Sequence, residues 1–157
     1  MAKLTITQIT GTISSSLLAE FKQYASVPDT TNDTLLTGIL KQAILRVQEY
    51  SDRALLACSV KQQAAVPMET GIIQLYLGGG EVSSVINMND GSDVMYNALP
   101  GGRLGLFKRG GEVEVTFTVT PAENALEQVK ETVFRYATAV YDGEDSGVLG
   151  SILNEVL

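Results

Sequence analysis

The clearest hydrophobic pattern in the chain lies between Asp33 and Asp52, where apolar residues recur every three or four positions. The residues of this stripe are Leu36, Leu40, Ala43, Ile44, Val47 and Tyr50. Lys41, Arg46 and Glu49 lie off the stripe, so a helix would have one apolar face and one polar face. The pattern predicts a helix of about four or five turns that contributes the centre of the core.

Two further segments have helical spacing. The first covers residues 12–26 and has Ser14 among its candidate N-caps. Its apolar face would consist of Leu17, Leu18, Phe21 and Ala25. The second follows the sequence Thr120–Glu123, which matches a capping box with Pro121 at the first helical position. Its apolar face would consist of Leu126, Val129, Val133, Tyr136, Ala137 and Val140.

Between these helices, residues 71–119 change to the spacing of β-strands. Residues 112–119 alternate apolar and polar side chains, as expected for a strand with one buried face. The Asp90-Gly91 pair is typical of a hairpin turn, and the glycines at 101–102 and 110–111 indicate further tight turns. We expect a small antiparallel meander in which residues 93–96 return along the preceding strand.

The final segment, residues 148–157, is apolar and short. Leu149, Ile152, Leu153 and Val156 have helical spacing, but a helix of this length is not stable alone in water. The segment therefore needs a groove, either on a partner or on the chain's own domain.

These elements predict an α+β fold that is mainly α. We expect a small bundle of three main helices, an inserted antiparallel β meander and a C-terminal helical tail. Residues 1–147 would form a single domain with its β insertion at about 71–119, and residues 148–157 would form a docking tail whose removal leaves the fold intact.

Composition narrows the possible functions. The chain has 157 residues, of which 45% are apolar and 18% charged, as expected for a folded globular protein. Eleven basic and eighteen acidic residues give a net charge of −7, which disfavours binding to nucleic-acid phosphates. The single cysteine, Cys58, follows an apolar stretch and is expected to be a buried, reduced thiol. No signal peptide or membrane span is apparent, so we expect a cytoplasmic protein in the producing cell.

Candidate catalytic groups are few. The chain has no histidine and one cysteine, which excludes the commonest general base and a cysteine-based zinc site. Asp90 with Asp93, and the acidic run at 142–145, could in principle form carboxylate sites, but turn formation and a polar helix end account for them. The segment around the glycines at 78–80 does not contain the lysine that a phosphate-binding loop requires. We therefore expect no enzyme activity, no cofactor and no metal.

The order of these elements resembles the head–tail connector (adaptor) family of long-tailed double-stranded DNA phages. Residues 33–36 are similar to that family's "D-x-L-L" helix start, and residues 47–55 to its "V-E-x-Y-T-G-R-x-L" helix end, with Ser51-Asp52 replacing Thr-Gly. The strand at Gly102-Arg103 and the "P-x-x-V-K-x-A"-like helix entry near Val129 continue the likeness. The resemblance covers residues 14–141 and rests on the joint order of short motifs.

The resemblance implies a structural subunit that forms a ring of about twelve copies between the portal protein and a stopper or tail-terminator protein. DNA would pass through this ring without sequence-specific binding, and the protein would reside in the neck of the virion after assembly in the bacterial host cytoplasm. The family has no catalytic residues. Its C-terminal segment tends to dock into the portal, which implies that role for Leu149, Ile152, Leu153 and Val156.

Each subunit of a cyclic ring must present two complementary faces to its neighbours. Clusters of opposite charge could supply them, and the candidate subunit contacts are Arg46, Arg53, Lys108, Arg109, Asp142, Glu144 and Asp145. Three alternatives remain open: another neck or tail-completion ring protein, a cytosolic binding module, and an enzyme with a carboxylate site. Ring proteins of the first kind are usually richer in β-structure, so a helical fraction above about a third would favour the connector.

Overall fold

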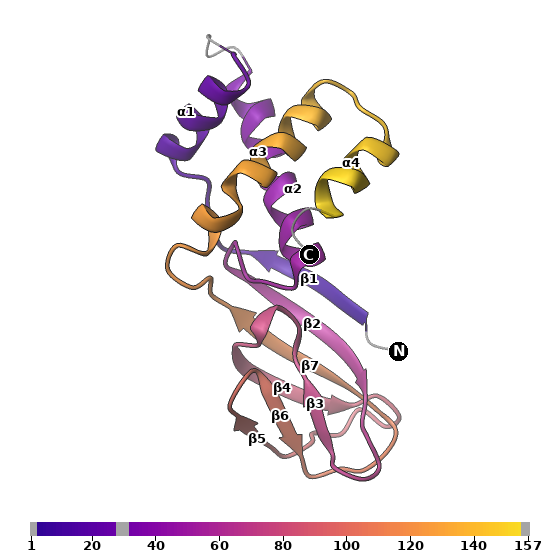
Figure 1. Ribbon diagram of the computed structural model, residues 1–157. Coiled ribbons are helices and arrows are strands. Elements are labelled where there is room, and N and C mark those ends of the chain that lie inside the picture. Colours follow the sequence, from indigo (N-terminus) through magenta and orange to yellow (C-terminus); the bar gives the residue numbers. More distant parts are fainter. Residues whose placement is uncertain (1–2, 28–31, 155–157) are drawn as a thin grey trace. The chain divides into compact units, whose positions relative to one another are not determined.

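The computed structural model describes residues 3–27 and 32–154, which divide into two compact units. The β unit comprises Met1–Thr10 and Leu56–Thr120, and the helical unit comprises Gly11–Leu55 and Pro121–Leu157 (Figure 1). Helices account for 39% and strands for 28% of the chain, so the expected α+β class is confirmed. A mainly α chain with three main helices is not confirmed, because the described residues form four α-helices and two antiparallel sheets.

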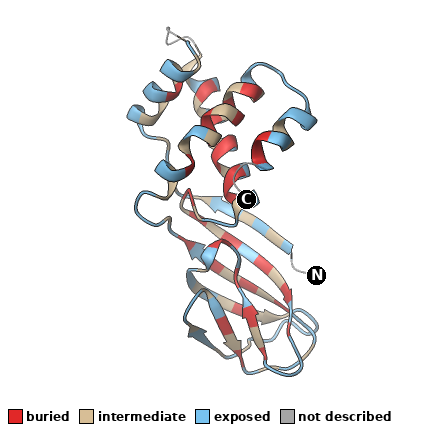
Figure 2. Cartoon of the chain, viewed as in Figure 1, coloured by how far each residue is buried: buried red, intermediate tan, exposed pale blue. Residues whose placement is uncertain are grey.

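The helical unit consists of α1 (Ser15–Tyr24), α2 (Asp33–Ser51), α3 (Ala125–Tyr141) and α4 (Ser146–Leu153). Helix α2 packs mainly on α3, and α3 also contacts α4. The Phe21 ring of α1 lies 5.5 Å from the Phe134 ring of α3, centroid to centroid. Figure 2 shows the buried positions of α2 and α3 inside this unit.

Helix α2 confirms the hydrophobic pattern that predicted it. All of its predicted stripe is fully buried except Tyr50, which is partly exposed and whose hydroxyl donates to the Asn154 side chain. The helix ends at Ser51, and the next residue, Asp52, adopts a left-handed conformation with φ of 53°. This is the position at which a left-handed residue commonly terminates a helix.

The predicted capping box of α3 is wrong. The helix begins at Ala125, not at Pro121, and its N-cap is Asn124, which has a left-handed conformation and makes no side-chain cap hydrogen bond. The N-cap of α1 is confirmed, because the Ser14 hydroxyl accepts from the Leu17 backbone N–H at 3.1 Å.

The β unit contains two antiparallel sheets. The four-stranded sheet has the order β1–β2–β7–β4, with bounds β1 Lys3–Ile9, β2 Cys58–Ala65, β7 Glu112–Val119 and β4 Glu81–Asn87. The three-stranded sheet has the order β3–β6–β5, with bounds β3 Ile72–Gln74, β6 Arg103–Leu106 and β5 Tyr96–Leu99. In the long central pair, Cys58 lies opposite Val119 and Ala65 opposite Glu112.

The predicted meander is only partly correct. The turn at residues 101–102 joins β5 to β6 as expected, but the other connections differ. Strands β1 and β2 lie outside the expected 71–119 range, and β7 pairs with both β2 and β4. Beyond an isolated bridge between Ile86 and Asp93, β4 does not pair with the segment that follows it; β5 pairs with β6 instead. Within the expected β region, β3 ends at Gln74, and a 3₁₀ turn, Tyr76–Gly78, follows.

A buried glutamine links the two sheets. The Gln62 side chain of β2 donates to the Gln74 carbonyl at 2.9 Å and accepts from the Tyr76 backbone N–H at 2.8 Å. The side chain is 1% exposed, so these bonds satisfy polar groups that have left water. They fix β3 and the 3₁₀ turn against β2, and the apolar core around them includes Val60, Phe117 and Leu104.

Candidate interaction surfaces

The described residues contain no group of three or more cysteine, aspartate or glutamate side chains placed to hold a metal ion. Cys58 is 1% exposed and forms no disulfide within the described residues, which confirms that the cysteine is buried. In this part of the chain, no helix has the length and apolar character needed to cross a membrane.

The Asp90 carboxylate has a local structural role. It accepts from the Ser92 hydroxyl at 2.6 Å and from the Ser92 backbone N–H at 2.9 Å. These bonds, with a smaller contribution from the charge of Lys108, lower the pKa of the Asp90 carboxyl. They hold the turn after β4, as expected for an aspartate in this position.

The glycines at 78–80 allow close approach of backbone segments. A Cβ on Gly80 would lie 1.7 Å from the Thr118 carbonyl oxygen of β7, and a Cβ on Gly79 would lie 2.9 Å from Cα of Gly102. These approaches account for both glycines through packing, without a phosphate ligand.

The predicted subunit contacts are distributed over both units. Five lie in the helical unit: Arg46, Arg53, Asp142, Glu144 and Asp145. All five are exposed, and they form no ion pair with one another among the described residues. The Arg46 guanidinium instead hydrogen-bonds the Tyr136 hydroxyl, which raises the pKa of Arg46, and lies 3.5 Å from Glu49. The Asp145 carboxylate caps α4 by accepting from the Val148 N–H at 3.0 Å.

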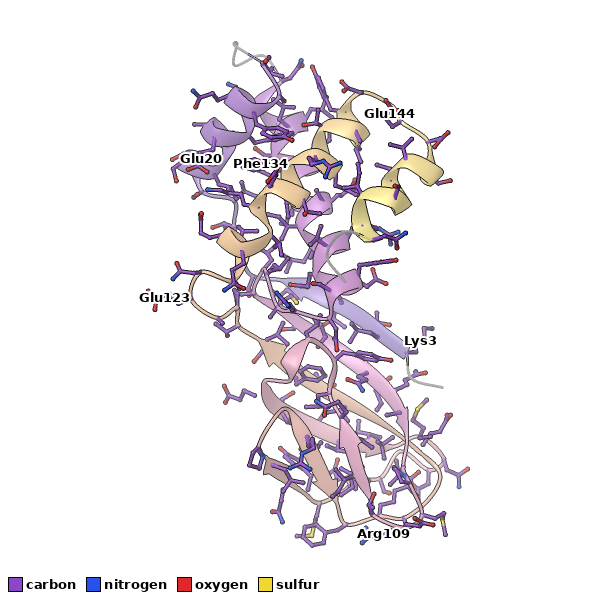
Figure 3. The ribbon with its side chains drawn as sticks, in the orientation of Figure 1. Lys3, Glu20, Arg109, Glu123, Phe134 and Glu144 are labelled. Atoms are coloured by element: carbon purple, nitrogen blue, oxygen red, sulfur yellow. The ribbon has the colours of Figure 1, made fainter. Side chains whose placement is uncertain are left out.

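The other two, Lys108 and Arg109, lie at one end of the β unit, where Figure 3 labels Arg109. Arg109 is exposed, but its Nη1 donates to the Leu106 and Lys108 carbonyls at 3.3 and 3.4 Å. The guanidinium is thereby held in one orientation. The role of all seven residues as subunit contacts stays a prediction.

The predicted docking tail packs on its own unit. Ile152 and Leu153 are 8% and 4% exposed, and Leu149 is half-buried. Val156 lies outside the described residues. In this conformation Ile152 and Leu153 are covered by the helical unit itself, so contact with a partner would require α4 to move. Their docking role stays a prediction.

An apolar patch at the end of the β unit was not predicted from the sequence. Met68, Met95 and Phe107 are 71%, 74% and 66% exposed, and Met88 is partly exposed. We call these four residues the tip patch. They belong to three adjoining turns, because Val66 donates to the Gly111 carbonyl, Met88 to Glu112 and Phe107 to Met95, at 2.8–3.0 Å.

The only sequence signal for the tip patch is that large apolar residues occur where turns are expected, and single exposed residues of this kind are common. Their convergence depends on the pairing of distant strands. Exposed apolar clusters of this kind mark interaction surfaces on soluble proteins.

A second surface feature is a groove of about 590 Å³ on the helical unit. Its lining includes Leu18, Ala19 and Val27, and the Lys22 ammonium lies 2.7 Å from the Asp33 carboxylate at its side. The two ions connect α1 to the start of α2. The neighbouring Lys130 bonds Glu20 and Glu127, both at 2.9 Å, and these carboxylates raise the pKa of Lys130.

Comparison of the sequence with protein-family models and with curated proteins finds no match. Comparison of the fold with solved structures finds chains of gene transfer agent (GTA) particles. A chain in the neck of an empty GTA particle, computed with C6 symmetry, has a TM-score of 0.67 and 16% identity, over 98% of this chain and 94% of that chain.

Two further GTA structures contain similar chains. One is the virion of the native GTA particle, with a TM-score of 0.63 and 17% identity, over 97% of this chain and 93% of that chain. The other is the neck of the native particle computed with C12 symmetry, with a TM-score of 0.57 and 16% identity, over 97% and 94%. At these identities the likeness establishes a shared fold, and it includes both units of the chain.

Proposed function

We propose that the chain is a structural subunit of the neck of a tailed phage or phage-like particle. The observation that carries this proposal is the shared fold with chains of GTA particles, over 97–98% of this chain and 93–94% of the others. A match of this extent includes the helical unit, the β unit and their order in the sequence. An isolated helical or β module would share only one of them.

Within the neck, we favour an adaptor ring between the portal protein and a stopper or tail-terminator protein. Helices form 39% of the chain. This helical fraction exceeds about one third, the value above which we expect an adaptor and not a more β-rich neck protein. The short motifs at residues 33–36 and 47–55 also favour the adaptor family. The proposed ring has about twelve copies, and two of the similar chains come from necks computed with C6 and C12 symmetry.

The charge of the chain fits a channel for DNA. A net charge of −7 on each copy gives a ring with a strongly negative total, which repels phosphates. We propose that DNA passes through without sequence-specific contacts, and that the protein acts without a catalytic site, cofactor or metal. Its assembly would take place in the host cytoplasm and its final location would be the virion neck.

If the chain forms a ring, its assembled form has a defined mass in solution. Light scattering coupled to size-exclusion chromatography over a concentration series is expected to detect a species of about twelve subunits, because the complementary faces of a ring saturate on closure. If isolated copies stay monomeric, the same measurement with portal particles is expected to recruit about twelve copies to each particle. A chain that stays monomeric alone and with portal particles would contradict the adaptor.

A further inference from the structure

The tip of the β unit carries two adjoining features, a projecting turn and a hollow. The first is the turn at Pro67–Thr70, from which Met68 projects. The Met68 sulfur lies against the bare backbone of Gly110, since a Cβ on that glycine would lie 2.5 Å from it. Glu69 and Arg109 are both exposed, and the Arg109 guanidinium lies against Gly71, directly after this turn. We call the turn and the Arg109 side chain the knob.

The second feature is the hollow, which has a volume of about 300 Å³. Val94, Met95 and Phe107 provide its apolar walls, together with the polar residues Asn87 and Ser92. Asp93 and Lys108 also line it, so the hollow too has one carboxylate and one cation. The volume gives room for an unbranched side chain, and methionine adapts to irregular walls because it has three rotatable side-chain bonds.

The charges of the knob and the hollow are complementary. Glu69 and Arg109 on the knob, and Asp93 and Lys108 at the hollow, form no ion pair within the described chain, although Lys108 lies in the field of Asp90. A contact between knob and hollow can therefore place Glu69 opposite Lys108, and Arg109 opposite Asp93. Equal numbers of both signs favour a protein partner over a phosphate surface, which requires clustered cations.

We propose that the knob of one copy inserts into the hollow of the next copy, with Met68 between Met95 and Phe107. The contact joins two different surfaces and is therefore heterologous, as a ring of identical subunits requires. It deepens the proposed function, on which it rests, by assigning one surface of the contact between copies. Among the described residues, the three most exposed of the large apolar side chains become covered in this contact.

A charge exchange tests the pairing of Glu69 with Lys108. Glu69→Lys and Lys108→Glu are each expected to weaken self-association by about tenfold, measured by light scattering over a concentration series. The double variant is expected to recover most of the loss because it restores one opposite-charge pair. Glu123→Lys, at an exposed position of the helical unit, is the matched charge control and is expected to leave self-association unchanged.

Disulfide formation between two variants tests the contact even if association is weak. Met68→Cys protein is mixed with Phe107→Cys protein, so a mixed disulfide can form only between copies. It is expected to form about tenfold faster than with Leu35→Cys protein, whose thiol lies at a 54% exposed site of the helical unit. The native Cys58 is buried and does not compete.

The outcomes separate the two proposals. If rings form but the mixed disulfide is no faster than the control, the contact between tips is overturned and the proposed neck function stands. A second result also overturns the contact between tips and leaves the neck function standing. In it, the tip variants lose binding to a neighbouring ring protein while self-association is unchanged, which shows that the tip binds that protein. If neither association nor the mixed disulfide is observed, and portal particles recruit no copies, both proposals fail.

Discussion

A Gly80→Ala variant is expected to lose about 3 kcal/mol or more of stability, one of the largest effects of a single added methyl group in this chain. Its Cβ would lie 1.7 Å from the Thr118 carbonyl oxygen, which belongs to the backbone of β7. Neither segment can yield locally, because Glu81 is already paired with Thr118 at the start of β4. The edge strand must therefore separate from β7 where the pairing begins.

The matched control is Gly78→Ala, two residues earlier in the same turn. Gly78 has a φ of 77°, but a Cβ there would meet nothing within 4 Å. The expected loss is therefore only the strain of a left-handed alanine, about 1–2 kcal/mol. Urea unfolding followed by circular dichroism measures both variants. Equal losses at the two positions would show that conformational strain, and not the approach to β7, determines the requirement for glycine.

Local patterns predicted the helices and the central strand because the relevant interactions repeat along the sequence. The spacing of Leu36, Leu40 and Ile44 suffices to define α2, and the alternation of residues 112–119 predicts β7 with its observed bounds. Strand β1 was missed although Leu4 and Ile6 alternate with polar residues, because the alternation is short and breaks at the bulge between Ile6 and Gln8. Its partner β2 lies 49–60 positions away in the sequence, so no local signal indicates the pairing.

Most connections of the sheets could not be predicted from local signals. The turn at Asp90-Gly91 is present, but β5 pairs with β6, across the turn at residues 101–102, and not with β4. The tip patch has the same origin. Met68 lies between β2 and β3, Met95 between β4 and β5, and Phe107 between β6 and β7. These connections adjoin only because the strands bring them to one end of the unit. Charge clusters were visible in the sequence, but their partners were not.

The second large effect is expected at the C-terminal tail. Deleting residues 148–157 removes Ile152 and Leu153 from the helical unit, where they are 8% and 4% exposed. Each buried side chain of this size contributes about 2–4 kcal/mol, so we expect the helical unit to lose several kcal/mol of stability. This reverses the expectation from sequence, which treated the tail as dispensable for the fold.

Hydrogen exchange resolves this effect by unit, because amide protection reports the local free energy of opening. The α3 amides are expected to exchange at least about tenfold faster in the truncated chain, while those of the β2–β7 pair keep their rates. Val148→Ala is the matched control, since Val148 belongs to the same helix but is 40% exposed, and it is expected to change protection little. Unchanged α3 protection after truncation would show that the tail is not part of the core.

The same packing sets a condition on docking to a portal. While α4 packs on its own helical unit, its buried apolar residues are not available to a partner. Only the fraction of molecules in which α4 is released can bind, so the apparent affinity for the portal is reduced by that fraction. Tyr50→Phe removes the hydrogen bond to Asn154 without altering Leu149, Ile152 or Leu153. It is expected to raise the released fraction, and with it the binding to portal particles, by about three- to tenfold. Weaker binding of this variant would mean that α4 docks while still packed on α3, through the faces it already exposes.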